Sequence, residues 1–181
     1  AFDLDQEPAS MREMYGKGGT GDQMLLARRL AQFGTKFITV NYGGWDMHSN
    51  VKKSLEGRVP PLDKALSAFV QDMYDQGLSD NTLLVVTGEF GRTRLNQNAG
   101  RDHWPQVSCA LLAGGGMKLG QTIGETNRLG EYAVERPVHF QEITSTIYYN
   151  LGIDPRETTV IDTGGRPQYL LDHRDPMKEL V

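Results

Sequence analysis

Apolar residues recur at three- and four-residue steps in three segments of the chain, and this spacing predicts three amphipathic helices. The segments are residues 22–33, 61–76 and 140–151. Pro60 and Pro61 are expected to start the second helix, because proline is tolerated in a first helical turn. Gly152 follows the third helix, where glycine commonly ends one. Residues 1–20 and 154–181 are expected to be mostly irregular.

Three short apolar runs predict strands, at residues 37–40, 83–86 and 107–113. A predicted helix separates the first two strands, and a right-handed parallel crossover is the default for a strand, a helix and a strand in succession. Residues 87–107 have no helical periodicity, so the third strand should start near the carboxyl edge of the other two and run antiparallel. The pattern therefore predicts an α/β fold with a mixed sheet.

Polar residues that suit metal coordination follow the predicted strands. Asp46 and His48 come after the first strand, Glu89 comes after the second, and His103 lies on the loop that returns over the same edge. Asp46 and His48 are two positions apart, so in extended chain their side chains point to the same side. Oxygen and nitrogen ligands of this kind suit zinc, manganese or iron.

Each of these residues also has an ordinary interpretation. Asp46 and His48 could form a loop turn with a surface histidine, Glu89 could cap a helix or pair with a base, and His103 could stack beside Trp104. Because parallel strands bring their carboxyl ends to one edge, the shared location favours a metal site over these alternatives.

Three arginines, Arg92, Arg94 and Arg101, lie in the same loop of a chain whose net charge is −4. Guanidinium groups bind tetrahedral oxyanions through paired hydrogen bonds. Arg92 is the candidate for such a role because it lies nearest the strand end. A salt bridge or a solvated surface position is the alternative for each arginine.

The length of 181 residues and a hydrophobic content of 38% fit a single domain. The charge shows no basic stripe, so no nucleic-acid partner is expected. No apolar run reaches the roughly 18 residues of a membrane span, so none is expected. The opening residues, AFDLDQEPAS, read like the middle of a longer protein.

Several motifs resemble one protein family. WDMH, VVTGEFGRT, NAGRDHWP, ALLAGGG and ITSTIYYNLGID resemble the carboxyl-terminal portion of an uncharacterised bacterial family of sulfatase-like proteins, grouped with the alkaline phosphatase superfamily. The resemblance implies a three-layer α/β sandwich with a mixed, mainly parallel central sheet. Residues 1–181 would then be a single domain that forms the carboxyl-terminal part of a larger alkaline-phosphatase-like domain.

The same resemblance implies a metal-dependent hydrolase of sulfate or phosphate esters. Asp46 and His48 resemble one metal-binding pair, Glu89 falls where relatives carry an aspartate, and His103 resembles a later ligand. Arg92 would offset charge on the anionic ester substrate. The metal would be a divalent ion such as zinc, manganese or calcium. Members of this family often carry a twin-arginine export signal, which implies an exported or periplasmic parent protein.

Two features of the resemblance limit what this stretch is expected to do alone. The nucleophile of such enzymes comes from an earlier strand outside these residues, which implies an inactive fragment that binds metal weakly or not at all. Phe90 stands where a metal-binding histidine is expected. This replacement favours an alternative, a non-catalytic protein on a degenerate sulfatase-like fold that binds an anion or a glycan.

Overall fold

Three helices and a short 3-10 helix pack together in the amino-terminal part of the computed structural model, which describes residues 1–181. These elements are η1 (Leu4–Gln6), α1 (Ala9–Tyr15), α2 (Gly19–Gln32) and α3 (Val51–Asp75). Eight buried residues form the core cluster, and all of them belong to α1, α2 or α3: Tyr15, Met24, Leu25, Ala27, Ala65, Ala68, Phe69 and Met73. The main core is therefore helix against helix.

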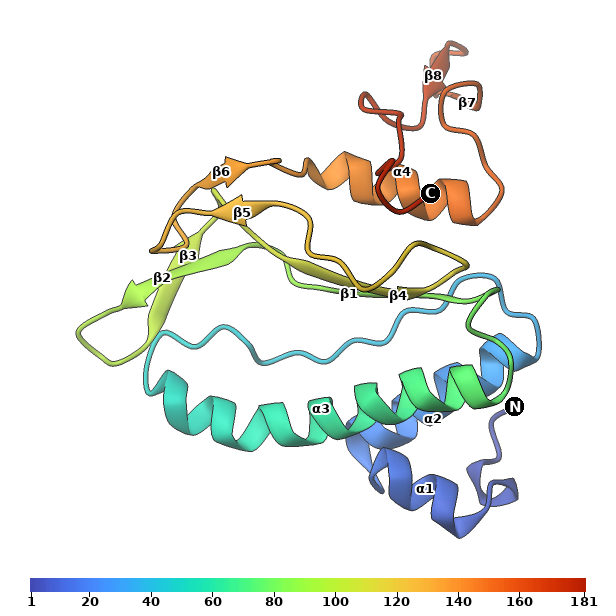
Figure 1. Ribbon diagram of the computed structural model, residues 1–181, viewed down its shortest axis with the longest axis vertical. Coiled ribbons are helices and arrows are strands. Elements are labelled where there is room, and N and C mark those ends of the chain that lie inside the picture. The colour runs from blue at the N-terminus through green and yellow to red at the C-terminus, as the bar shows by residue number, and fades with distance from the viewer.

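The remaining elements are short antiparallel strand pairs and one further helix. Strand β1 (Leu83–Thr87) pairs with β4 (Ala110–Gly114), and β2 (Gly91–Leu95) pairs with β3 (Arg101–Trp104). Two smaller pairs are β5 (Glu125–Thr126) with β6 (Ala133–Glu135), and β7 (Thr159–Ile161) with β8 (Pro167–Tyr169). Helix α4 (Phe140–Asn150) lies on the opposite side of the β1–β4 pair from α1, α2 and α3 (Figure 1).

The predicted three-layer α/β sandwich with a mainly parallel central sheet is wrong. The structure holds four separate two-stranded sheets, all antiparallel. Residues 37–40 run extended beside the β1–β4 pair (Figure 1) and form no strand, so the parallel crossover to β1 is not made. Ile38 and Val40 instead pack their side chains against the helical core, while Phe37 is exposed. The strand predicted at 37–40 is therefore wrong, because an apolar run alone does not specify a pairing partner.

The antiparallel relation predicted between the strands at 83–86 and 107–113 is confirmed. Leu83 of β1 lies opposite Gly114 of β4, and Thr87 lies opposite Ala110. The segment between these two strands forms a separate hairpin, β2–β3. The sequence predicted a polar loop there. That hairpin carries much of the candidate site.

The helix predicted from residue 61 begins ten positions earlier, because α3 starts at Val51 and passes through Pro60 and Pro61. Each proline lacks the N–H that would bond the preceding turn, so a proline pair inside a helix was not expected. The buried face from Ala65 to Met73 holds the second half of α3 against α1 and α2. Residues 51–59 extend the helix toward the β2–β3 hairpin, which places the start of α3 next to the candidate site.

A buried ionic network ties the three helices together. Arg28 of α2 contacts Glu7 through Nη2 and Oε2 at 2.6 Å, and its Nε lies 2.8 Å from Oδ2 of Asp72 in α3. The Tyr15 hydroxyl of α1 donates a 2.8 Å hydrogen bond to the same Asp72 oxygen. Asp72 is 1% exposed. Polar groups buried this deeply need hydrogen-bonded partners, and the partners here link α1, α2 and α3 to one another.

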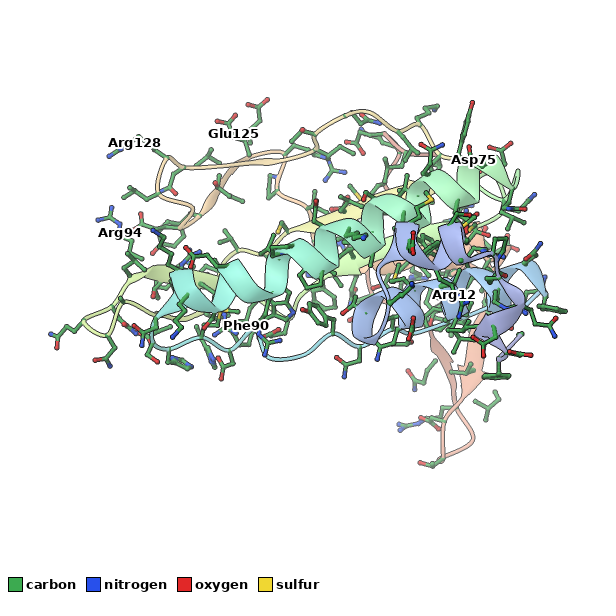
Figure 2. All side chains as sticks on the ribbon, turned by 90° about the horizontal axis from the view of Figure 1, so that it is seen from below. Arg12, Asp75, Phe90, Arg94, Glu125 and Arg128 are labelled. Atoms are coloured by element: carbon green, nitrogen blue, oxygen red, sulfur yellow. The ribbon has the colours of Figure 1, made fainter.

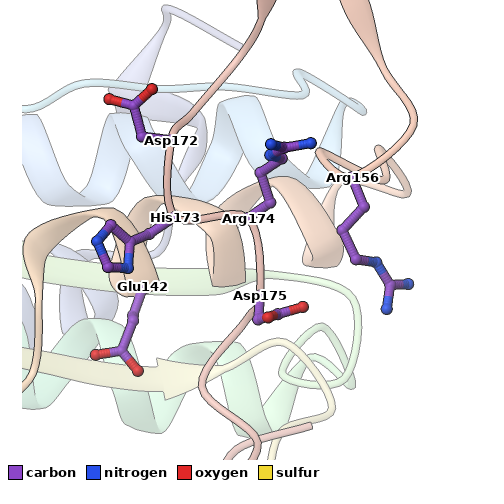
Figure 3. A pocket seen from close by; sticks show the side chains of 6 residues that line it. All are labelled: Glu142, Arg156, Asp172, His173, Arg174 and Asp175. Atoms are coloured by element: carbon purple, nitrogen blue, oxygen red, sulfur yellow. The ribbon is translucent and has the colours of Figure 1, made fainter.

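The carboxyl-terminal segment packs along α4. The Ser145 hydroxyl donates to the carbonyl oxygen of Arg174 at 2.6 Å, and the Met177 amide donates to Thr146 Oγ1 at 2.9 Å. A pocket of about 530 Å³ opens between this segment and α4 (Figure 3). Its lining is entirely polar and contains none of the predicted site residues. The lining residues are Glu142, Arg156, Asp172, His173, Arg174 and Asp175.

No helix is both long enough and apolar enough to span a membrane.

Candidate metal centre

The loop that leads into α3 is fixed to the β2–β3 hairpin by backbone hydrogen bonds. The Arg101 amide donates to the Met47 carbonyl at 2.9 Å, and the Asn50 and Val51 amides donate to the carbonyls of Asn98 and Ala99 at 3.0 and 2.9 Å. These contacts join two segments that are about 50 residues apart in the sequence. They bring the Asp46–His48 loop over the residues that follow Glu89.

Gly100 allows the loop and the hairpin to approach this closely. A Cβ atom at position 100 would lie 1.9 Å from the His48 carbonyl carbon and 2.2 Å from the Ser49 nitrogen. Both neighbours are backbone atoms, which cannot move aside as a flexible side chain would. Glycine at this position is therefore a condition for the docked loop.

Met47 anchors the loop between the two predicted ligands. Its side chain is buried, whereas Asp46 and His48 on either side of it are exposed. Alternation of this kind is expected where the chain is extended, because residues i and i+2 point to the same side. The Asp46 carboxylate and the His48 imidazole consequently face the same space.

Asp46, His48 and His103 converge on one point. His103 Nε2 lies 2.8 Å from Asp46 Oδ1, and His48 Nε2 lies 3.0 Å from the same oxygen. One potential ligand atom from each residue falls within 4.8 Å of the other two. Metal–ligand bonds of about 2.0–2.2 Å place neighbouring ligand atoms about 3 Å apart, so this spacing fits a single small cation.

Glu89 lies beside this group of three without joining it. Arg92 links the two regions, because its Nη1 donates to Asp46 Oδ1 at 2.6 Å and its Nη2 donates to Glu89 Oε1 at 2.9 Å. The Arg92 side chain is 15% exposed, and the two carboxylates are each about 60% exposed. The structure thus brings all five predicted site residues together, with Arg92 between the acids.

Phe90 forms an aromatic wall of the site. Its ring centroid lies 4.6 Å from that of His103, and the Arg92 guanidinium carbon lies 5.3 Å from the Phe90 ring. The position where the sequence resemblance implied a histidine is thus occupied by a residue that packs against one candidate ligand and against the arginine. It supplies no ligand atom itself.

Two residues that sequence reasoning missed support His48. Asp102 Oδ1 lies 2.8 Å from His48 Nδ1, the ring nitrogen that faces away from Asp46. Asn96 donates from Nδ2 to Asp102 Oδ1 and to the His48 carbonyl, both at 3.1 Å. The adjacency of Asp102 to His103 was the only signal in the sequence, and it did not indicate which side chain Asp102 would contact.

The charges of the site shift the acid–base properties of its residues. The hydrogen bond from Arg92, followed by that from His103, holds the pKa of Asp46 well below its usual range. The hydrogen bond with Asp102 raises the pKa of His48, and the same bond lowers the pKa of Asp102. Asp46 is therefore ionised at neutral pH and can act as an anionic ligand.

The two other arginines of this region have different surroundings. Arg101 donates from its guanidinium to the Arg92 carbonyl at 2.9 Å, which holds the two strands of the hairpin together. Arg94 is exposed and projects outward from the hairpin (Figure 2). Only Arg92 among the three contacts the candidate ligands.

A family model described as "Protein of unknown function (DUF1501)" matches residues 1–181, so the chain belongs to that family. No curated protein matches the chain, and no solved structure does. The sequence resemblance to sulfatase-like proteins of the alkaline phosphatase superfamily is corrected by this finding, because no model of either group matches. The motifs that suggested the resemblance, GEFGRT and GRDHWP, are those of β2, β3 and the residues around them.

Proposed function

We propose that Asp46, His48 and His103 hold a divalent metal ion, and that the chain contributes this centre to the hydrolysis of sulfate or phosphate esters. The convergence of one carboxylate oxygen and two imidazole nitrogens within 4.8 Å is the observation that carries the proposal. The three residues come from two segments that the docked loop brings together, so their meeting is a property of the fold and not of local sequence.

The ligand types narrow the choice of metal. Calcium prefers a shell of oxygen ligands, whereas imidazole nitrogen suits zinc and other first-row metals, and carboxylate oxygen suits manganese. Two histidines and one aspartate therefore favour zinc or manganese over calcium. Three protein ligands leave coordination positions open, which is typical of catalytic rather than structural sites.

A metal bound in this way would polarise an ester oxygen and lower the pKa of a bound water. The chain's own contribution is to hold the three ligands and to balance charge around them. Arg92 fixes Asp46 Oδ1 through its 2.6 Å hydrogen bond and partly neutralises Asp46 and Glu89. A reduced negative charge beside the centre favours the approach of an anionic ester.

The openness of the site favours a second candidate, a non-catalytic protein that binds an anion or a glycan. The side chains of Asp46, His48 and His103 are 61%, 47% and 48% exposed. Hydrolytic sites commonly exclude bulk water, and nothing encloses these residues. Metal binding without ester hydrolysis would support this second candidate.

Calorimetry with zinc chloride and with manganese chloride tests the proposed centre. We expect binding of one ion per chain, of weak affinity, because ordering exposed loop residues costs about 1–2 kcal/mol each. His48→Ala and His103→Ala should abolish the binding heat. His173→Ala is the matched control, since this histidine lies beside α4 and stacks on His139.

Hydrolysis is measured separately, with nitrophenyl phosphate and nitrophenyl sulfate as generic substrates. Metal-dependent release of nitrophenol that is lost in His48→Ala and retained in His173→Ala would support the enzyme. Metal binding with no turnover of either ester would contradict the proposed hydrolysis and support the non-catalytic binding protein. No binding heat with either metal would overturn the centre itself.

A further inference from the structure

His48 and His103 contribute equivalent nitrogens to the proposed centre, yet only His48 has a partner on its other ring nitrogen. His48 Nδ1 lies 2.8 Å from Asp102 Oδ1, while the opposite nitrogen, Nε2, faces Asp46 Oδ1 at 3.0 Å. The ring is thus held between two carboxylates. Both carboxylate oxygens can only accept a hydrogen bond, so when a metal ion occupies the Nε2 side, the remaining ring proton is held on Nδ1 by Asp102.

We infer that Asp102 is a positioning residue that fixes the tautomer and the ring orientation of His48, so that the Nε2 lone pair is directed toward Asp46 and His103. This inference rests on the proposed metal function, because a lone pair held against a carboxylate oxygen is useful only when a cation lies between them. Metal-binding histidines commonly donate their second ring N–H to a carboxylate in this way.

Asp102 is itself held in place by the turn of the hairpin. Its amide donates to Thr93 Oγ1 at 2.9 Å, and its Oδ1 accepts from Asn96 Nδ2 at 3.1 Å. Asn96 Oδ1 also accepts from the amides of Asn98 and Gly100, both at 3.0 Å. Asn96 therefore connects the turn, the carboxylate and the His48 backbone, and it limits the positions that Asp102 can adopt.

The contact between the two rings adds to this constraint. The ring centroids of His48 and His103 are 5.0 Å apart with an interplanar angle of 46°. A half-turn of the His48 ring would place Cδ2 beside Asp102 and Cε1 beside Asp46, so both contacts would be lost. Among the three candidate ligands, the Asp102 carboxylate forms a side-chain hydrogen bond with His48.

The protonation of His48 in the zinc-loaded chain is measured by long-range proton–nitrogen NMR. We expect zinc on Nε2 and the proton on Nδ1 in the wild-type chain, and faster exchange of that proton with solvent in Asp102→Ala. The zinc dissociation constant should rise about 10–100-fold in Asp102→Ala. Asp102→Asn retains an oxygen acceptor and should lose less affinity than Asp102→Ala.

Asp63→Asn, at an exposed position of α3, is the control and should change neither quantity. The cobalt-loaded chain gives a further signature, because the visible spectrum of cobalt reports the geometry of its ligands and should change in Asp102→Ala. Zinc on Nδ1 of His48 in the wild-type chain, or zinc affinity unchanged in Asp102→Ala, would overturn the inference. Absence of zinc binding by the wild-type chain would overturn the metal centre itself, and a change of the His48 ring signals in metal-free Asp102→Ala would then still support the orienting contact.

Discussion

His103 Nε2 lies 2.8 Å from Asp46 Oδ1, although the two residues are 57 positions apart in the sequence. The contact exists because the 46–50 loop docks on the β2–β3 hairpin through main-chain hydrogen bonds. Residues that could hold a metal are thus positioned by the backbone of a hairpin turn.

Gly100→Ala should separate the loop from the hairpin. The new Cβ would lie 1.9 Å from a backbone carbon of His48, so the two segments must move apart. We expect a loss of about 1–3 kcal/mol in the free energy of unfolding, as for other overpacked positions, together with weaker zinc binding. Chemical denaturation and calorimetry measure the two effects.

Gly57→Ala is the matched control for this substitution. Gly57 lies within α3, and a Cβ there would meet no atom within 4 Å. Alanine is favoured over glycine inside a helix by up to about 1 kcal/mol, so this variant should be slightly more stable and should bind zinc as the wild type does. Equal zinc binding by Gly100→Ala and Gly57→Ala would show that the close approach is unimportant.

Phe69→Ala should destabilise the helical core. Phe69 is 5% exposed and belongs to the cluster formed by α1, α2 and α3. Truncation of a buried phenylalanine costs about 3–5 kcal/mol in the free energy of unfolding, through lost burial and a residual cavity. Tyr74→Ala on the same helix removes a side chain that is 72% exposed and should cost far less. Equal losses in the two variants would contradict the burial of this face.

Tyr15→Phe should weaken the ionic network between the helices. The Tyr15 hydroxyl donates to buried Asp72 at 2.8 Å, and burial together with this bond raises the pKa of Tyr15 far above its usual value. Loss of a hydrogen bond to a charged group costs about 1.5–3 kcal/mol. Tyr149→Phe, at an exposed position of α4, should leave the unfolding free energy unchanged. The same denaturation midpoint for both variants would show that the Tyr15 hydroxyl does not stabilise the fold.

Acid should release the carboxyl-terminal segment from α4. Arg136 donates from Nε and Nη2 to the two carboxylate oxygens of Glu179 at 2.7 and 3.0 Å, and this pair lowers the pKa of Glu179 to about 2. Because the folded pKa lies below the ordinary value of 4.5, the stabilisation is fully present above about pH 4.5. It is lost as the pH falls toward about 2.

Thermal unfolding measured across this pH range tests the assignment. The melting temperature of Glu179→Gln should lie below that of the wild type near neutral pH, and the difference should shrink as the pH falls toward about 2. Glu157→Gln alters an exposed acid and is the control. A difference between wild type and Glu179→Gln that does not depend on pH would show that the carboxylate charge contributes nothing.

The parts of the fold that depend on local periodicity could be predicted from the sequence. The spacing of apolar residues located α2 and α4 closely, and it located the buried half of α3. The start of α3 at Val51 was missed because residues 51–59 carry a weak apolar stripe and precede two prolines. The pairing of strands that are distant in the sequence could not be predicted, because the apolar run at 37–40 carries no information about which segment would lie beside it.

The candidate site was predicted for a reason that the structure does not support. A parallel sheet edge was expected to bring Asp46 and Glu89 together, but a docked loop and a hairpin do so instead. The hairpin was missed because GRTRL and RDHW are too polar to show a strand pattern. The turn residues between them, with Asn96 accepting amides two and four positions on, were the available signal.

The central claim is that Asp46, His48 and His103 hold one divalent metal ion. Crystals of the chain grown with zinc, with diffraction recorded on both sides of the zinc absorption edge, test it most directly. The account predicts one anomalous peak at about 2.0–2.2 Å from Asp46 Oδ1, His48 Nε2 and His103 Nε2. A map with no peak at these atoms, or with its peak beside His139 and His173 instead, would contradict it.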